Sequence, residues 1–211
     1  MREMDKTFIQ ARCCAAAALL FLTSGLPTAL AADPLNQRIE GIATYRCGAC
    51  HGPGGQGPNP IFPKLAGQNT EYLTRQIMNF KSGERKGAVM FYQLGDLSAT
   101  DVKALAEHFS RQQLVPAAVA DKALHEAGRK LYFEGNSMSV ITACATCHGP
   151  AARGSGQMPR MAGQHAEYIT EQIYRFIDSE RLPGQAQRHP VGLVLTHDEI
   201  RAVSIFLSAL E

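Results

Sequence analysis

Four cysteines and two histidines of this 211-residue chain recur in one short pattern. The two copies read Cys47-Gly48-Ala49-Cys50-His51 and Cys144-Ala145-Thr146-Cys147-His148. Two thiols one helical turn apart can add across the two vinyl groups of a porphyrin, and the histidine that follows can then place its ring on the iron. Cys-x-x-Cys-His is accordingly the attachment sequence of c-type haem. Two copies predict two haems c, each held by two cysteines and one histidine.

Other uses of such cysteines are a thioredoxin-like redox pair, a zinc site and structural disulfides. A redox pair needs no histidine after it and follows a strand, whereas residues 39–45 read as helix. Zinc takes four ligands from one neighbourhood, and the two motifs lie far apart in the chain, each with its own histidine. Haem attachment explains the repeated pattern better than these uses do.

Residues 1–31 read as a secretory signal peptide. Basic residues near the start precede an apolar run at residues 13–22, and small residues lead to a cleavage site after Ala31. The run has roughly ten residues, which is too short for a membrane span of about 20. Cys13 and Cys14 stand at the start of the run and do not close it, where a lipid-bearing cysteine would have to lie. The mature protein is therefore expected to be exported, and its remaining cysteines all belong to the two motifs.

The second half of the chain repeats the first beyond the two motifs, which indicates a tandem duplication. The matching segments are residues 63–68 with 159–164, and Gly41-x-x-x-Tyr45 with Gly128-x-x-x-Tyr132. The repeat predicts domains at residues 32–117 and 118–211, joined by a short Pro/Ala linker at about 116–121. Each domain is near the lower size limit for independent folding, and a covalently held haem would supply the apolar body that so small a core lacks.

The elements that must position the motifs read as helices. Apolar residues recur at helical spacing in residues 35–49 and 70–80, and again after the capping residues Ser98 and Thr196. No stretch alternates with period two for long enough to form a sheet. The predicted fold class is all-α.

Composition and charge exclude two broad classes of protein. Hydrophobic residues make up 45% of the chain and charged residues 19%, which excludes wholesale disorder. Lys and Arg number 21 against 19 Asp and Glu, a formal charge of +2 that is too balanced for a nucleic-acid binder.

Taken together, the paired attachment motifs, the Gly-x-x-x-Tyr segments and the Pro-x-Leu-Ala-Gly-Gln segment resemble the dihaem class I cytochromes c of the cytochrome c4 kind over residues 35–211. The resemblance implies two cytochrome c folds related by a pseudo-twofold axis, each wrapped around one covalent haem. It also implies that the carbonyls of Pro63 and Pro159 accept the ring N–H of the iron ligands His51 and His148 and so fix their tautomers.

The function implied by the resemblance is electron transfer in the periplasm. The expected partners are redox proteins: a membrane-bound or periplasmic donor, and a terminal oxidase, reductase or dehydrogenase. Peripheral association with the membrane is compatible with this class, and no catalytic residue is needed beyond the cofactor. The alternative is a peroxidase-like haem enzyme, or a ligand sensor, that uses an open iron in the C-terminal domain.

The sixth iron ligand in the family is a methionine before the last helix of each domain. Met90 lies eight residues before Ser98 and is the expected ligand of haem 1, with core packing as the alternative. The corresponding loop of the second half, residues 182–193, contains no methionine. His189 is the expected ligand there, which would make haem 2 bis-histidine and lower in reduction potential than haem 1.

Alternatives for haem 2 are an exposed His189 without a role, ligation by Met158 or Met161, and a five-coordinate iron. Met161 aligns with Leu65 and is therefore expected in the core. No role is expected for Met78 and Met138, and the histidines outside the motifs are expected to be exposed or structural: His108, His125, His165 and His197.

Overall fold

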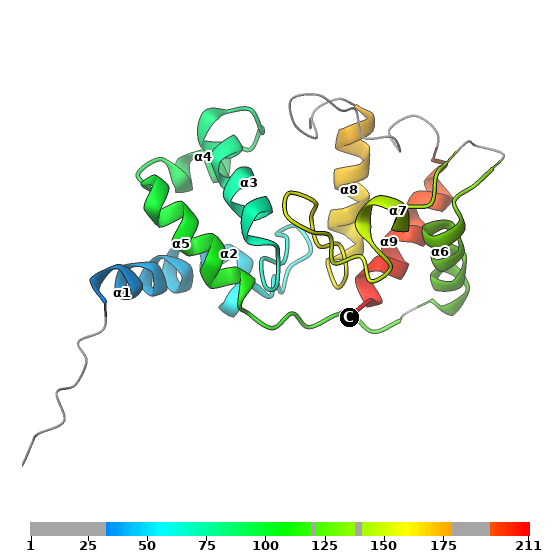
Figure 1. Cartoon of the computed structure of the whole chain (residues 1–211), viewed down its shortest axis with the longest axis horizontal. Coiled ribbons are helices and arrows are strands. Elements are labelled where there is room, and N and C mark those ends of the chain that lie inside the picture. The colour runs from blue at the N-terminus through cyan, green and yellow to red at the C-terminus, as the bar shows by residue number, and fades with distance from the viewer. Residues whose placement is uncertain (1–32, 120, 138–140, 179–194) are drawn as a thin grey trace, which may run out of the picture. The chain divides into compact units, whose positions relative to one another are not determined.

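The computed structural model describes residues 33–119, 121–137, 141–178 and 195–211, all within one compact unit at residues 32–211. These described residues are helical apart from turns and loops, and their only β feature is an isolated bridge between Asn136 and Ile141. The expected all-α fold class is confirmed (Figure 1).

The two halves contain matching sets of helices. The first half contains α1 (Pro34–Gly41), the π-helical η1 (Ile42–Cys47), α2 (Gly48–His51), the short 3-10 turn η2 (Pro53–Gly55), α3 (Thr70–Ser82), α4 (Ala88–Leu94) and α5 (Ala99–Ser110). The second half contains α6 (Lys122–Glu134), α7 (Ala145–His148), α8 (Ala166–Ile177) and α9 (His197–Ala209). In each half a helix leads toward the cysteine motif and a capped helix closes the domain.

The closing helices α5 and α9 begin as the sequence predicts. The Ser98 side chain accepts the Asp101 N–H at 3.1 Å, and the Asp101 carboxylate accepts the Ser98 N–H at 3.0 Å. Thr196 and Glu199 form the same reciprocal pair at the start of α9. Such capping boxes satisfy backbone donors that the first turn of a helix leaves unpaired. Both predicted helix starts are confirmed.

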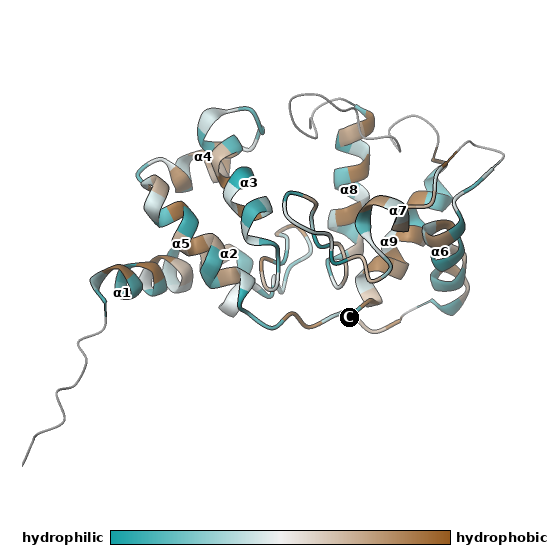
Figure 2. Ribbon diagram, in the orientation of Figure 1, coloured by the Kyte–Doolittle hydropathy of each residue, from teal (hydrophilic) through white to brown (hydrophobic). Residues whose placement is uncertain are grey.

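Each half has its own apolar core under its closing helix. In the first half, α5 packs against α1 and α3 and buries Val102, Leu105 and Phe109. In the second half, α9 packs against α6 and α8 and buries Val203 and Phe206. Figure 2 shows that the helices carry apolar residues on one part of their surface and polar residues on another. Amphipathic helices of this kind bury one face and leave the other in water.

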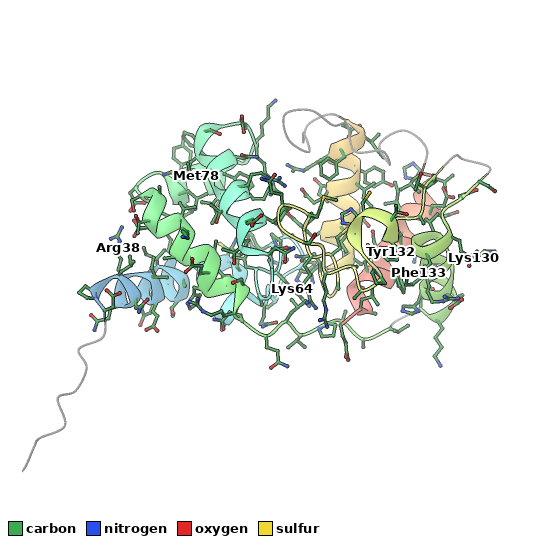
Figure 3. The ribbon with its side chains drawn as sticks, in the orientation of Figure 1. Arg38, Lys64, Met78, Lys130, Tyr132 and Phe133 are labelled. Carbon is green, nitrogen blue, oxygen red and sulfur yellow. The ribbon has the colours of Figure 1, made fainter. Side chains whose placement is uncertain are left out.

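The two Gly-x-x-x-Tyr segments match in sequence, but their residues do not occupy equivalent positions in the structure. A Cβ on Gly128 would lie 2.1 Å from the Ala202 carbonyl oxygen, so α6 can approach α9 this closely only with glycine there. A Cβ on Gly41 would meet nothing within 4 Å. Tyr132, labelled in Figure 3, is fully buried on α6 against Phe206 of α9. Tyr45 is 83% exposed.

The buried face of the first helix is shifted by two residues from the sequence match. The buried residues with the same spacing are Ile39, Ile42 and Ala43 in the first half, and Gly128, Leu131 and Tyr132 in the second. The two helices also meet their motifs differently: the π-helical turn η1 leads directly into the first motif, whereas α6 ends well before Cys144.

The segment that joins the halves contacts both of them. Ala117 donates its N–H to the Ser208 carbonyl at 2.9 Å, and Val115 donates its N–H to Gln56 Oε1 at 3.1 Å.

None of the helices in the described part of the chain is both long enough and apolar enough to cross a lipid bilayer.

Candidate functional site

The first cysteine motif completes an unbroken helical run that starts at Pro34 and ends at His51. Gly52, with φ at 72°, ends this run in the left-handed region that favours glycine. Cys47 and Cys50 carry free thiols and are both half-buried. Burial raises the pKa of Cys47 to about 11. The pair therefore has the one-turn spacing that two thioether bonds require.

One hydrogen bond holds the His51 ring in the form that an iron ligand requires. Its side chain is buried, and its Nδ1 lies 2.8 Å from the Pro63 carbonyl oxygen. A carbonyl can only accept, so Nδ1 carries the proton and Nε2 keeps its lone pair. Burial lowers the pKa of His51, against the opposing effect of the Pro63 hydrogen bond. The ring is therefore held neutral with Nε2 available to a metal.

The second motif has the same arrangement. His148 is buried; this burial lowers its pKa, and the Pro159 backbone acts on that pKa in the opposite direction. Cys144 is half-buried, Cys147 is exposed, and both are free thiols. The hydroxyl of the buried Tyr132 donates to the carbonyl of Gly149, directly after the motif, at 2.5 Å. α6 is thereby joined to the turn that follows His148.

These residues fit haem c at both motifs. In each half, two cysteine thiols precede a buried histidine beside an apolar cluster. In the first half the Nδ1 of that histidine is bonded to a backbone carbonyl, which leaves Nε2 as the metal-binding atom. In the part of the chain that the structure describes, no three His, Cys, Asp or Glu side chains gather to hold a metal ion. Each histidine would therefore act with the porphyrin nitrogens rather than with other side chains.

The sequence predicts Met90 in the loop before the last helix of its domain. The structure places it on a short helix, α4. Its side chain is half-buried and packs against the apolar core of the first half. This core also contains residues of the helical run that leads to Cys47. The structure therefore brings Met90 to the same core as the first motif.

Two cations that sequence reasoning missed hold the end of α4. Arg46, next to the first motif, donates to the Gln93 carbonyl at 3.3 Å and forms an ion pair with Asp96 at 2.6 Å. Lys81 donates to the Leu94 carbonyl at 2.6 Å. Carbonyls at the end of a helix have no partner within it, and cations are favourable there. The sequence signal for the role of Arg46 was its position directly before Cys47, the first cysteine of the motif.

The structure separates the other candidates for haem 2. Met161 packs against the apolar core of the second half, as expected, and its N–H donates to the Ala152 carbonyl at 2.8 Å. Met158 directly precedes Pro159, and its carbonyl accepts from the Asn69 side chain of the first half at 2.6 Å. His189 lies outside the described residues.

The remaining histidines have structural contacts. The ring of His125 packs against Phe206 with centroids 5.2 Å apart, and His197 Nδ1 lies 2.5 Å from the Tyr174 hydroxyl. His165, at the start of α8, bonds through Nε2 to the Gly57 carbonyl of the first half. This contact between the halves had no signal in the sequence, because it depends on how the two domains pack.

Comparisons with known proteins match the two halves separately and together. A family model described as cytochrome C oxidase, cbb3-type, subunit III, matches residues 35–109, and one described as cytochrome c matches residues 125–211. Cytochrome c4 of Thiocapsa roseopersicina is 39% identical over 184 residues, which cover 84% of this chain and 93% of that protein.

A second relative and a solved structure extend the comparison. The thiosulfate dehydrogenase electron acceptor of Thiomonas intermedia (strain K12) is 38% identical over 168 residues, 77% of each chain. The crystal structure of reduced recombinant cytochrome c4 from Pseudomonas stutzeri matches with a TM-score of 0.77 at 32% identity, over 85% of this chain and 100% of that one.

Proposed function

Because this chain belongs to the cytochrome c4 family and is a dihaem electron carrier rather than an enzyme, we propose that it works in the periplasm with two differently ligated haems. The observation that carries haem binding in this proposal is the buried His51, whose Nδ1 is bonded to Pro63 at 2.8 Å beside two free thiols. When bound, each haem iron takes up and releases one electron.

In the first domain, Cys47 and Cys50 hold the haem, and His51 and Met90 bind its iron. The Pro63 carbonyl keeps the proton on Nδ1 of His51 and so fixes the orientation of the ring. Arg46 and Lys81 hold α4 in place, which limits the movement of the Met90 sulfur away from the iron. A thioether ligand favours ferrous iron, so haem 1 has the higher reduction potential of the two.

In the second domain, Cys144 and Cys147 hold the haem, and His148 binds its iron with Pro159 as the partner of its ring. We assign the sixth position to His189. The sequence of the loop at residues 182–193 supports this assignment because it contains histidine and no methionine. A second imidazole stabilises ferric iron relative to a thioether, so haem 2 has the lower potential.

The proposed location follows from residues 1–31, which read as a signal peptide. The proposed partners are a membrane-bound or periplasmic donor and a terminal oxidase, reductase or dehydrogenase. Similarity to a thiosulfate dehydrogenase electron acceptor supports a periplasmic dehydrogenase as the donor. Docking between such partners is transient and covers a small area.

The ligation of haem 1 is tested in the holoprotein with two methionine variants. Met90→Ala should abolish the methionine-to-iron charge-transfer band in the near infrared and lower the potential of one haem. Met78→Ala is the matched control, because Met78 lies on α3 and is 42% exposed. Retention of the band in Met90→Ala would show that the sulfur ligand lies elsewhere in the chain.

A further inference from the structure

A glutamine side chain from each half binds the backbone of the other half. Gln164 accepts the Lys64 N–H at 2.9 Å and donates to the Lys64 carbonyl at 2.9 Å. Gln68 accepts the Arg160 N–H at 2.7 Å and donates to the Arg160 carbonyl at 2.8 Å. These contacts are reciprocal: the residues that match in the repeat exchange roles across the interface, as a pseudo-twofold axis requires.

Both glutamines are buried and held in one orientation. Gln68 is 6% exposed and Gln164 is 7% exposed. Each amide oxygen also accepts the N–H of the next residue in its own chain segment, Asn69 at 2.9 Å and His165 at 3.0 Å. With two donors on its oxygen and one acceptor for its nitrogen, the amide group of each glutamine has only one orientation that satisfies its partners.

The peptide groups bound by these glutamines are the ones that contact the iron-binding histidines. The Pro63 carbonyl accepts from His51, and the N–H of that same peptide group, on Lys64, donates to Gln164. Figure 3 shows Lys64 in the region where the two halves meet. A continuous path of hydrogen bonds therefore runs from His51 through one peptide group to the other domain.

The second half has the matching arrangement of residues in the opposite direction. The Pro159 backbone raises the pKa of the His148 ring against the lowering effect of burial, and the next N–H, on Arg160, donates to Gln68 of the first half at 2.7 Å. Each motif histidine is thus one peptide group away from a glutamine of the other domain.

Such a path affects how strongly the histidine donates electrons. A peptide whose N–H is hydrogen-bonded is polarised, and its carbonyl becomes a better acceptor. A better acceptor at Nδ1 makes the imidazole a stronger ligand through Nε2. A stronger ligand stabilises ferric iron and lowers the reduction potential.

We propose that Gln164 lowers the reduction potential of haem 1 and that Gln68 lowers that of haem 2, each acting across the domain interface through the peptide group beside the partner's histidine ligand. Both are positioning residues that touch neither haem iron nor its ligand directly. The inference rests on the proposed histidine ligands and does not depend on the sixth ligand of either haem.

The test is a potentiometric titration of the holoprotein, with each haem followed by its own hyperfine-shifted methyl resonances in NMR spectra. Those resonances are assigned by contacts to residues of the same domain, so the assignment does not require Met90 or His189 to be ligands. Gln164→Leu should raise the potential of haem 1 and leave haem 2 unchanged, and Gln68→Leu should do the reverse. The expected shift is up to about tenfold in the reduction equilibrium, which is ~59 mV for one electron.

Asn69→Ala provides the matched control. The Asn69 side chain donates across the interface to the Arg153 carbonyl at 3.1 Å and to the Met158 carbonyl at 2.6 Å, and it bonds to neither glutamine. The Asn69 group that donates to Gln68 is the backbone N–H, which the variant keeps. This variant should leave both potentials unchanged. A shift as large as that of Gln164→Leu would show that any loss of interface contacts moves the potentials, which would overturn the proposal.

The glutamate variant gives a second test if Gln164→Leu does not fold. Gln164→Glu keeps an oxygen acceptor for the Lys64 N–H and adds charge to it, so it should lower the potential of haem 1 more than that of haem 2. A purely structural role would move both variants in the same direction. Equal shifts of both haems, or a shift confined to the variant's own domain, would contradict the proposal. Loss of haem c from the purified wild type would instead contradict the proposed function.

Discussion

At the scale of single residues, the most informative feature is the proton on the motif histidine. The Pro63 carbonyl determines which nitrogen of His51 carries it, and burial keeps the ring neutral by lowering its pKa. Both effects come from residues outside the five-residue motif. The motif alone therefore identifies the ligand, and the fold decides which atom of that ligand is free.

The methionines near the second motif yield a prediction at this scale. Met158→Leu and Met161→Leu should leave the absorption and electron paramagnetic resonance spectra of haem 2 unchanged, because the proposed sixth ligand is His189 and Met161 packs in the core. Met161→Leu should cost less than about 1.5 kcal/mol in a denaturant titration, as a swap that conserves volume. A spectral change in either variant would reopen the assignment of the sixth ligand.

Asp101 provides a prediction of pH dependence. Its hydrogen bonds from Arg38 and from Ser98 hold the pKa of its carboxyl well below the ordinary value. In the unfolded chain the pKa of this carboxyl is about 3.9. The folded state therefore binds this proton more weakly, and the resulting stability is present above about pH 4 and lost as the pH falls below it.

Asp101→Asn removes this contribution. The difference in urea midpoint between wild type and variant, followed by far-ultraviolet circular dichroism, should be largest near pH 6 and should shrink toward pH 3. The comparison of two proteins at each pH cancels changes common to both, such as acid loss of iron ligands. A difference that stays constant or grows as the pH falls would contradict the role given to the ion pair with Arg38, which the structure places at 2.9 Å.

Much of the chemistry at this scale could be predicted from the sequence, and some could not. Cys47, Cys50 and His51 are adjacent in the chain, so their spacing is enough to identify them. Gln68 and Gln164 had only the signal of a repeated segment, because their contacts form between residues roughly one hundred positions apart. Contacts across a domain interface depend on packing that local patterns do not contain.

At the scale of elements, the two opening helices show where a sequence repeat misleads. The Gly-x-x-x-Tyr match aligned Gly41 with Gly128 in the sequence repeat, but only Gly128 lies at a helix crossing. The sequence predicted the starts of α5 and α9 well, because a capping box depends on residues three positions apart. It could not predict the π-helical turn Ile42–Cys47, which depends on fitting the helix to the core below it.

Alanine substitutions at the two glycines test this difference. Gly41→Ala should stabilise the protein by about 0.5–1 kcal/mol, because alanine is the better helix former and its Cβ meets nothing within 4 Å. Gly128→Ala should destabilise it by about 1–3 kcal/mol or more, because its Cβ would lie 2.1 Å from the Ala202 carbonyl. Denaturant titrations of the two holoproteins check both values. Equal effects would show that the repeat match was correct after all.

At the scale of the whole molecule, the proposed ligand sets give two domains of one fold different sixth ligands. The same motif, the same buried histidine and the same interface glutamine occur in both halves of the chain. Met90 has no counterpart in the loop at residues 182–193, so the halves differ where they bind the sixth position. Two unequal haems in one carrier give the electron a preferred site, the haem of higher potential, within the protein.

The most direct measurement is a potentiometric titration of the holoprotein, with near-infrared and electron paramagnetic resonance spectra recorded through the titration and repeated on His189→Ala. The account predicts two haems of different potential. The haem of higher potential should show the methionine charge-transfer band, and the other a bis-imidazole signal that disappears in the variant. Methionine bands from both haems, or a five-coordinate iron that binds carbon monoxide at once in the wild type, would contradict the account.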